Sequence, residues 1–288
     1  MANTTTTSAD DLLYAAIIEE SVIEELRAIN VMPKTFRQKS MVGVPSKAAD
    51  FPTWPTETAA ALTEGTDITG SAISTAKKTI TCGEVGLMTT VTDVLEKSDI
   101  LNGLGEYSPV LARAVKTKVD ADCAALLQVT DGGTGIESSG NPLTYTLFLQ
   151  ALTKMELANA HTAGKIIGVL HTQQASDLRT DLGITLSNPQ LQNIDPHGEM
   201  YSNRAGYFGT LNDVDIFADN NVPTVNTAAD RAGGLYVKGY TFGLATKWAL
   251  RVELQRNASL RATEIVVTTN YGVGELVDAA GCPIVTDA

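Results

Sequence analysis

The sequence predicts an α+β fold in which one long helix and a small α/β unit stand between two strand-rich regions. Three observations lead to this prediction. The chain of 288 residues contains 36 threonines, and threonine favours strands. A long helix with a clear start signal is indicated over residues 108–128. Helical and strand patterns alternate between residues 144 and 217, and strand patterns fill the last third of the chain.

The chain is acidic and poor in charge. Its formal net charge is −12, and charged residues make up 19%, against about 25% in an average soluble domain. Acidity disfavours both a nucleic-acid reader and a protein that binds anionic membranes. No apolar run approaches the ~20 residues that span a bilayer, and the N-terminus lacks the pattern of a signal peptide. We therefore expect synthesis in the cytoplasm and no membrane partner, and we take the sparse charge as a hint that partners cover much of the surface.

The N-terminal region predicts an acidic amphipathic helix followed by an extended basic stretch. Residues 8–30 carry a net charge of −5, and residues 31–50 carry +3. Pro33 and Pro45 keep the second stretch extended. Two interpretations stay open: a helix packed on its own domain, or an arm that reaches a neighbouring subunit. In the second, charges pair between subunits, with Glu19, Glu20, Glu24 and Glu25 facing Lys34, Arg37, Lys39 or lysines of the next segment.

Residues 50–93 predict a long two-stranded hairpin with strands over 73–81 and 85–93. Two prolines bracket Trp54 at its start, and Lys77 and Lys78 lie on its first strand. Its apolar content is thin and polar residues occupy both faces. An isolated two-stranded ribbon is marginal in water. We therefore expect this hairpin to lie on another part of an assembly, with Trp54 and the two lysines as candidate contact residues.

The middle of the chain predicts a spine helix and then the α/β unit. Ser108 at the N-cap and Pro109 at the first helical position start the helix, which continues to about residue 128. The expected order after it is a helix over 145–160, a strand over 165–171, a helix over 173–182, an irregular stretch over 183–207 and a strand over 211–217. The last third predicts strands over 234–238, 248–254 and 264–269.

No set of residues in the sequence carries recognisable chemistry. The glycine-rich stretch 131–135 lacks the pattern of a phosphate-binding loop, and Gly272-Val-Gly274 is only part of a dinucleotide fingerprint. Cys82, Cys123 and Cys282 are interpreted as buried apolar residues, because they stand far apart. The three histidines lack metal-ligand spacing.

Two carboxylate pairs, Asp120 with Asp122 and Asp213 with Asp215, are interpreted as solvated surface groups. No nucleophile, base and orienting group come together. We therefore expect no enzyme activity, no cofactor and no metal, and we favour a structural role.

The order of the parts resembles the major capsid protein of tailed bacteriophages, which has the Hong Kong 97-type coat fold. An N-terminal arm, a thin hairpin, a spine helix, an α/β unit and a strand-rich return follow one another in both. The local segments that carry the resemblance are residues 206–223, 234–245 and 253–256, with Thr263, Tyr271-Gly272 and 279–281 after them. The resemblance implies a division into an N-terminal helix and arm (1–49), an extended hairpin loop (50–100), a peripheral domain with the spine helix (101–143 and 236–288) and an axial domain (144–235).

What the resemblance implies is self-assembly into the pentamers and hexamers of an icosahedral viral capsid that encloses double-stranded DNA. The location is then the virion, and the partners are other copies of the chain, a portal and a scaffolding protein. We expect the scaffolding protein to be separate, because only about 30 residues of helix precede the arm. Some relatives crosslink a hairpin lysine to an asparagine; Lys77, Lys78 and Asn270 are of the right types, but this chemistry is not carried over. Two alternatives stay open: an encapsulin-type shell of a bacterial protein compartment, and an acidic α/β enzyme.

Overall fold

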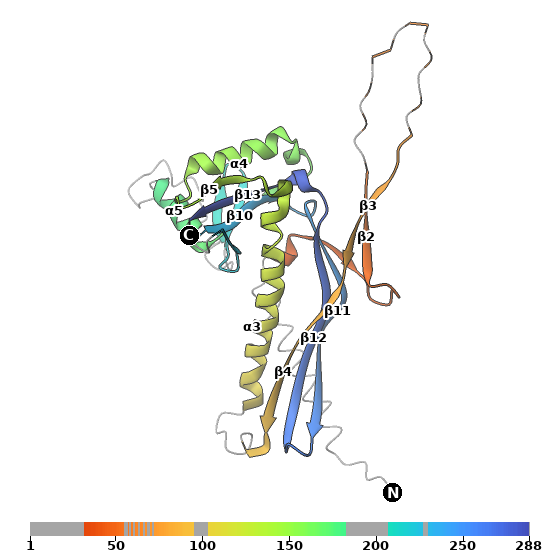
Figure 1. Ribbon diagram of the computed structural model, residues 1–288, viewed down its shortest axis with the longest axis vertical. Coiled ribbons are helices and arrows are strands. Elements are labelled where there is room, and N and C mark those ends of the chain that lie inside the picture. The colour runs from red at the N-terminus through yellow and green to blue at the C-terminus, as the bar shows by residue number, and fades with distance from the viewer. Residues whose placement is uncertain are drawn as a thin grey trace.

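The computed structural model describes residues 32–54, 72–94, 103–182, 207–226 and 230–287, with single positions between 57 and 70 and without the side chains of residues 103–109 and 112. The predicted acidic helix 8–30 and most of the predicted irregular stretch 183–207 lie outside these residues. Within them the chain forms an elongated wing, an α/β unit at one end of the wing and a projecting hairpin (Figure 1). The α+β class is confirmed.

The wing is a four-stranded sheet with one long helix along it (Figure 1). Its strands, in spatial order, are β1 (Arg37–Ser40), β11 (Phe242–Asn257), β12 (Ala262–Glu275) and β4 (Gly83–Thr92), and the helix is α3 (Gly103–Ala124). Apolar residues of the helix and the sheet form one buried cluster, made of Val91, Leu111, Val115, Leu250, Val252, Ile265 and Val267. Leu111 and Val115 are one helical turn apart, so they face the sheet together.

The spine helix differs from its prediction at both ends. It begins at Gly103, so Ser108 and Pro109 lie within its second turn and do not cap it. It ends at Ala124, and the chain continues as the 3-10 segment η2 (Leu127–Gly133). Thr130, Asp131 and Gly132 have non-helical backbone angles, with φ positive at the last two. The glycine-rich stretch therefore bends the chain after the spine helix has ended, at the end of η2.

The α/β unit is built on a seven-stranded sheet. Its strands, in spatial order, are β5 (Ile136–Ser138), β13 (Gly281–Asp287), β10 (Asp230–Val237), β6 (Ile166–Leu170), β8 (Val214–Ala218) and β7 (Tyr207–Leu211), with β9 (Thr224–Val225) paired to β10. Two helices accompany the sheet, α4 (Tyr145–Leu157) and α5 (Thr172–Asp181). The central strand β6 is buried along its whole length. A core of apolar residues from both helices and the sheet, including Phe148, Met155, Leu170, Leu178 and Ile216, holds the layers together.

Most elements of this unit confirm the sequence prediction, and one does not. The helix at 145, the strand at 166 and the helix at 172 lie where their patterns place them, and His171 caps the second helix. The strand predicted over 211–217 is confirmed from Val214 onward, as β8, and is wrong before it. Asn212 and Asp213 both have positive φ and form a tight turn between β7 and β8. Asn and Asp adopt positive φ with less strain than most residues, so the turn can form at this position.

Two strands that the sequence assigned to the peripheral domain belong to the sheet of the α/β unit. β13 runs antiparallel to β10, and the three-residue β5 lies parallel to β13 at the edge. The C-terminal strand therefore returns into the unit that begins near residue 144. The domain boundaries themselves stay a prediction.

The projecting hairpin consists of β2 (Ala48–Thr53) and β3 (Ala76–Thr81), which pair antiparallel. The predicted pairing of 73–81 with 85–93 is wrong, because β4 pairs with β12 over its whole length. Only Cys82 separates β3 from β4, and one residue cannot reverse the chain into a hairpin. The chain instead leaves the hairpin and enters the wing directly. None of the described helices is long and apolar enough to cross a membrane.

Candidate assembly interface

The predicted contact residues fall into three places. Glu19, Glu20, Glu24 and Glu25 lie outside the described residues. Lys34, Arg37 and Lys39 lie on the segment η1 (Met32–Lys34) and on β1, and Trp54, Lys77 and Lys78 lie on the hairpin. Within the described chain, Lys39 and Lys77 come together at the root of the hairpin, although 37 residues separate them in sequence.

Residues 32–41 of the basic stretch pack against their own chain. β1 lies parallel to β11, with Lys39 opposite Ala245. Met32, Phe36 and Met41 are buried in the wing and at its junction with the α/β unit. The expectation that residues 31–50 form an arm extending to a neighbour is therefore wrong for residues 32–41. The apolar residues between the basic ones, which the charge count did not weigh, anchor this segment.

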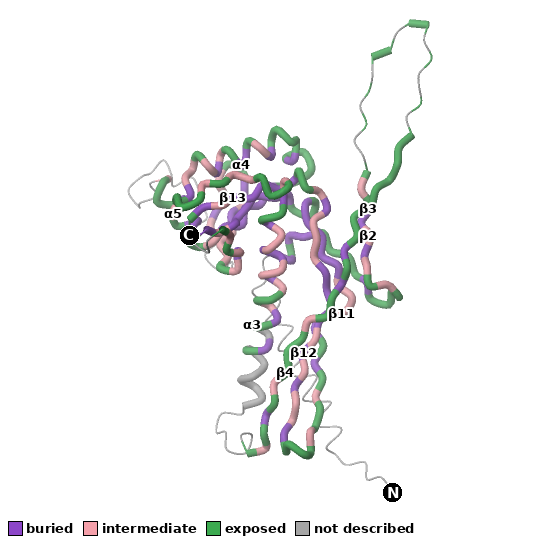
Figure 2. The backbone as a smooth tube through the Cα atoms, viewed as in Figure 1, coloured by how far each residue is buried: buried purple, intermediate pink, exposed green. Residues whose placement is uncertain are grey.

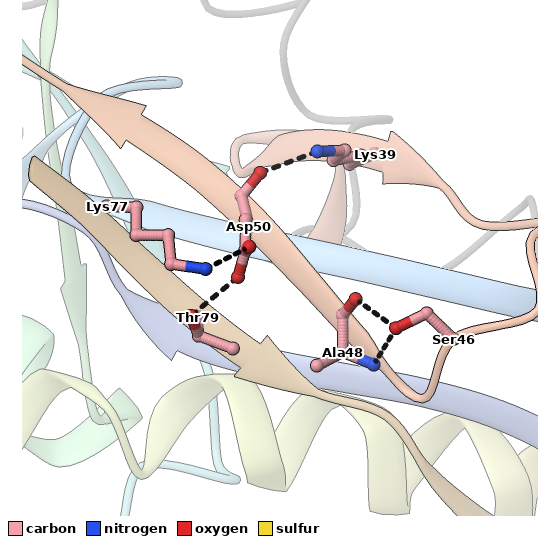
Figure 3. Close-up of polar contacts among 6 residues, drawn as sticks. All are labelled: Lys39, Ser46, Ala48, Asp50, Lys77 and Thr79. Atoms are coloured by element: carbon pink, nitrogen blue, oxygen red, sulfur yellow. Dashed lines mark hydrogen bonds and ion pairs between the residues drawn. The ribbon is translucent and has the colours of Figure 1, made fainter. Parts of the chain in front are cut away.

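Polar contacts around Asp50 tie β1 to both strands of the hairpin (Figure 3). Lys77 Nζ donates to Asp50 Oδ2 at 2.6 Å, and Thr79 Oγ1 donates to Asp50 Oδ1 at 2.6 Å. Lys39 Nζ donates to the backbone carbonyl of Asp50 at 2.5 Å and lies 5.4 Å from the centre of the Phe51 ring. The hydrogen bond from Lys77, followed by that from Thr79, lowers the pKa of Asp50. Two of the predicted assembly lysines thus act within their own chain.

A small apolar core seats the hairpin root on the wing. Ala49, Phe51, Ile80 and Cys82 pack with Met41, Ala245 and Leu276. Three glycines of β11 and β12 make the contact close enough. A Cβ on Gly272 would lie 2.4 Å from the Thr81 carbonyl oxygen, and one on Gly243 or Gly274 would lie 2.9 Å from Ile80. Gly272-Val-Gly274, a weak nucleotide signal in the sequence, is therefore a packing requirement.

Beyond this root the hairpin presents apolar side chains to solvent. Trp54 is 71% exposed, and Leu62 and Ile73 are similarly open. Figure 2 shows the described part of the hairpin beyond the root as exposed, in contrast to the buried interior of the α/β unit. Lys78 is exposed and approaches Glu275 only to 4.0 Å. Trp54, Leu62 and Ile73 are therefore exposed apolar residues on a projecting element.

The described residues hold no group of three or more histidine, cysteine or acidic side chains able to bind a metal ion. Cys82, Cys123 and Cys282 are buried free thiols, and burial raises the pKa of each. A reactive thiol needs the opposite environment. His171 does not face a nucleophile; its ring nitrogen accepts the amide hydrogen of Gln173 and caps α5.

The two carboxylate pairs of the sequence separate into different environments. Asp213 lies in the β7–β8 turn, whereas Asp215 lies on β8 and pairs with Lys165 at 2.9 Å. Asp122 accepts hydrogen bonds from Tyr271 and Lys118 at 2.6 Å each. Asp120 is only 5% exposed, so its interpretation as a solvated surface group is wrong. Its position on the inner side of α3 could not be read from spacing alone.

Comparison with solved structures identifies the fold. A capsid structure of the cyanophage P-SCSP1u matches with a TM-score of 0.66 and 16% identity, covering 90% of this chain and 88% of that one. A capsid of Ralstonia phage GP4 matches with a TM-score of 0.67 and 10% identity, covering 91% and 92%. A virus-like particle from Pyrococcus furiosus matches with a TM-score of 0.60 and 8% identity, covering 95% and 99%. No protein-family model and no curated protein sequence matches the chain.

These matches define the class of fold. The chain has the Hong Kong 97-type coat fold found in the major capsid proteins of tailed bacteriophages, as its order of parts predicts. The similarity covers nearly the whole chain and nearly the whole of each matched chain, so the α/β unit, the wing and the hairpin are compared together.

Proposed function

We propose that this chain is the major capsid protein of a tailed bacteriophage. In this proposal, copies assemble into the pentamers and hexamers of an icosahedral shell that encloses double-stranded DNA. One observation carries the proposal beyond the fold: among the described residues, the hairpin projects with exposed apolar side chains and has a packed core at its root alone. A second copy of the chain would bury these exposed side chains during assembly.

The hairpin is the main contact in this proposal. Trp54, Leu62 and Ile73 are exposed in the single chain, and each would contribute about 25 cal/mol for every Å² of apolar surface covered by a neighbour. The apolar packing and the Asp50 contacts at the root fix the direction in which the hairpin leaves the wing. The α/β unit, which the resemblance equates with the axial domain, would surround the symmetry axes.

Charge pairing is the secondary contact. The acidic residues Glu19, Glu20, Glu24 and Glu25 would face basic residues of a neighbouring copy. Arg37 and Lys78 are the stronger basic candidates, because Lys39 and Lys77 already contact Asp50. An exposed ion pair contributes only about 0–1 kcal/mol, so repetition over many copies is what would make these pairs matter.

The overall acidity suits a container for DNA. With a net charge of −12, the chain would enclose DNA without binding its backbone tightly, because such binding needs a positive surface. Sequence-specific binding of the DNA is not expected either. A separate scaffolding protein, a portal, synthesis in the host cytoplasm and a final location in the virion belong to the same proposal. So does the absence of an enzymatic role.

Electron microscopy of the purified chain tests this function. We expect closed shells hundreds of ångströms across, formed by the chain alone or with a co-expressed scaffolding protein. The double variant Trp54→Ser/Ile73→Ser should keep the melting temperature of the single chain and lose the shells. Leu157→Ser removes an exposed apolar residue from α4 instead and should still assemble. A wild-type chain that stays monomeric at high concentration, with and without a scaffold, contradicts the proposal.

An encapsulin-type compartment is the second candidate, because the resemblance that implies a capsid also extends to such shells. The contents of the purified particles separate the two candidates. Packaged double-stranded DNA, with terminase and portal genes nearby, supports the capsid. A protein cargo encoded beside the shell gene supports the compartment. The third candidate, an acidic α/β enzyme, requires a pocket lined by several perturbed carboxylates.

A further inference from the structure

The end of the spine helix meets the α/β unit through two carboxyl groups. Asp120 lies in the last two turns of α3 and is almost completely buried. Asp219 directly follows β8, and its backbone amide donates to the Leu170 carbonyl at 2.9 Å, which continues the pairing of β8 with β6. Asn221 contacts both carboxyl groups, and the charge of Asp219 acts on Asp120. This contact joins the wing to the sheet of the α/β unit.

The geometry leaves one oxygen of each carboxyl group buried without a hydrogen-bond donor. Asn221 satisfies one oxygen of each residue: its amide hydrogen goes to Asp219 Oδ1 at 2.9 Å, and its side-chain Nδ2 donates to Asp120 Oδ2 at 3.3 Å. The other two oxygens, Asp120 Oδ1 and Asp219 Oδ2, are buried, and no donor among the described residues reaches them. Two carboxylates are acceptors only, so they can bond to each other only when one carries a proton.

The surrounding charges do not supply an alternative donor. Burial is the main cause that raises the pKa of Asp120, to about 7, followed by the charge of Asp219 and the bond between the two carboxyls. Lys116 opposes this rise and is the weakest of the causes. Arg231 donates to the Val222 carbonyl at 3.2 Å through one terminal nitrogen, and its buried Nε contacts no acceptor among the described residues, so it does not reach either carboxyl group. The remaining ionisable groups that act electrostatically within this cluster are Asp122, Cys123, His171 and Tyr236.

We propose that Asp120 and Asp219 share one proton and that this proton holds the end of α3 to the α/β unit, so that the joint loosens when the proton leaves. The proposal concerns the single chain and does not depend on the proposed shell. The direction follows from the raised pKa of Asp120 in the folded state. The stabilisation is complete in acid, below the pKa of about 3.9 in the unfolded chain, and is lost as the pH rises through about 7.

The variant Asp120→Asn tests the shared proton. An asparagine is neutral at every pH, and its amide can donate to Asp219 as a protonated carboxyl does. Wild type and variant, compared in the same assembly state, should melt within about 2 °C of each other at pH 5.5. At pH 8.5 the variant should melt about 3–6 °C higher. The control Asp177→Asn, at a half-buried position on α5, should differ from wild type in melting temperature equally at both pH values. A pH-independent difference for Asp120→Asn overturns the proposal.

Two further measurements keep the test decisive if that variant folds poorly. The infrared spectrum of the wild type at pH 6.5 should contain the carbonyl band of a buried protonated carboxyl, and the band should disappear by pH 8.5 and in Asp219→Asn. Its absence at pH 6.5 overturns the proposal. Calcium or magnesium chloride added at pH 8.5 should leave the wild-type melting temperature unchanged. A rise that Asp219→Asn abolishes would mean that the pair holds a cation and not a proton, which also overturns the proposal.

Discussion

At the scale of single residues, the absence of a side chain at Gly272 permits the closest backbone approach between the hairpin root and the wing. A methyl group there would lie 2.4 Å from the Thr81 carbonyl oxygen, far inside contact distance. Gly272→Ala should therefore push β3 away from β12 and disturb the packing of Ile80. We expect a loss of about 1–3 kcal/mol in the free energy of unfolding, measured by denaturant titration of the unassembled chain.

Gly83→Ala is the matched control for this change. Gly83 also lies in the wing, at the start of β4, but a methyl group there would meet nothing within 4 Å. Its free energy of unfolding should stay within about 0.5 kcal/mol of wild type. Equal stability of the two variants would show that the close approach at Gly272 is not needed.

Asp230 gives an acid-dependent prediction that is opposite in sign to the one for Asp120. Its carboxylate accepts hydrogen bonds from Ser139 Oγ at 2.5 Å, Asn226 Nδ2 at 2.8 Å and the Gly140 amide at 3.1 Å. The bond from Asn226, followed by those from Ser139 and Gly140, lowers the pKa of Asp230. The stabilisation of the fold by these hydrogen bonds is therefore complete above the ordinary aspartate pKa. It is lost as the pH falls below that value and through the lowered pKa of Asp230.

Asp230→Asn should consequently melt lower than wild type at pH 7, and the difference should shrink toward pH 3. Thermal unfolding followed by circular dichroism at pH 7 and at pH 3 measures the difference in melting temperature. Asp177→Asn serves as the control here too, because Asp177 accepts only one hydrogen bond, from Gln173 on its own helix. A difference for Asp230→Asn that is larger at pH 3 than at pH 7 would contradict the assignment.

At the scale of elements, the spine helix depends on the sheet that it covers. Val115 is buried against the strands of the wing, whereas Arg113, two positions earlier, is exposed. Val115→Ala should reduce the free energy of unfolding by about 1–3 kcal/mol, because two buried methyl groups are lost and a cavity is left. Arg113→Ala should change it by less than about 0.5 kcal/mol. Chemical denaturation of the two variants compares these losses, and equal losses would mean that α3 does not pack through this face.

The hairpin shows how an element can be recognised while its pairing is missed. Threonine-rich strands with few apolar residues correctly indicated a thin two-stranded ribbon, and its need for a partner stays a prediction. The sequence pattern did not reveal that β2 is the strand that pairs with β3. It also did not reveal that β4 belongs to the sheet of the wing. Strand pairing is set by which edges meet in three dimensions, and Val267 opposite Leu87 lies 180 residues away in sequence.

At the scale of the whole molecule, the N-terminal residues are predicted to serve assembly more than folding. Deleting residues 1–30 should leave the melting temperature of the unassembled chain within about 2 °C of wild type, since the described core begins at Met32. The assembled shells should dissociate at a lower denaturant concentration, because the acidic residues of that segment no longer face a neighbour. Light scattering during denaturant titration measures this dissociation. Unchanged dissociation of the truncated shells would refute the role of the acidic segment.

Much of the fold could be predicted from local patterns, and little of the interface could. The helix at 145 follows from its apolar spacing and the Thr144 cap, and the strand at 166 follows from a short continuous apolar run. Nothing in the sequence indicates that Asp50 is contacted by both Lys39 and Thr79. These contacts depend on how the two hairpin strands pair and on how β1 crosses them. The contacts of Asp120 were missed for the same reason: its partner lies 99 residues away, after a strand of another sheet.

The sequence by itself determined the α+β class, the order of hairpin, spine helix and α/β unit, and the resemblance to a capsid coat protein. These depend on spacing, composition and turn residues, which act over a few positions. The tertiary structure alone decided that the basic segment from Met32 to Met41 is anchored on its own chain, that β13 returns to the α/β unit, and that Asp120 meets Asp219. These depend on long-range packing, where the free energy comes from surfaces that the chain brings together only when it folds.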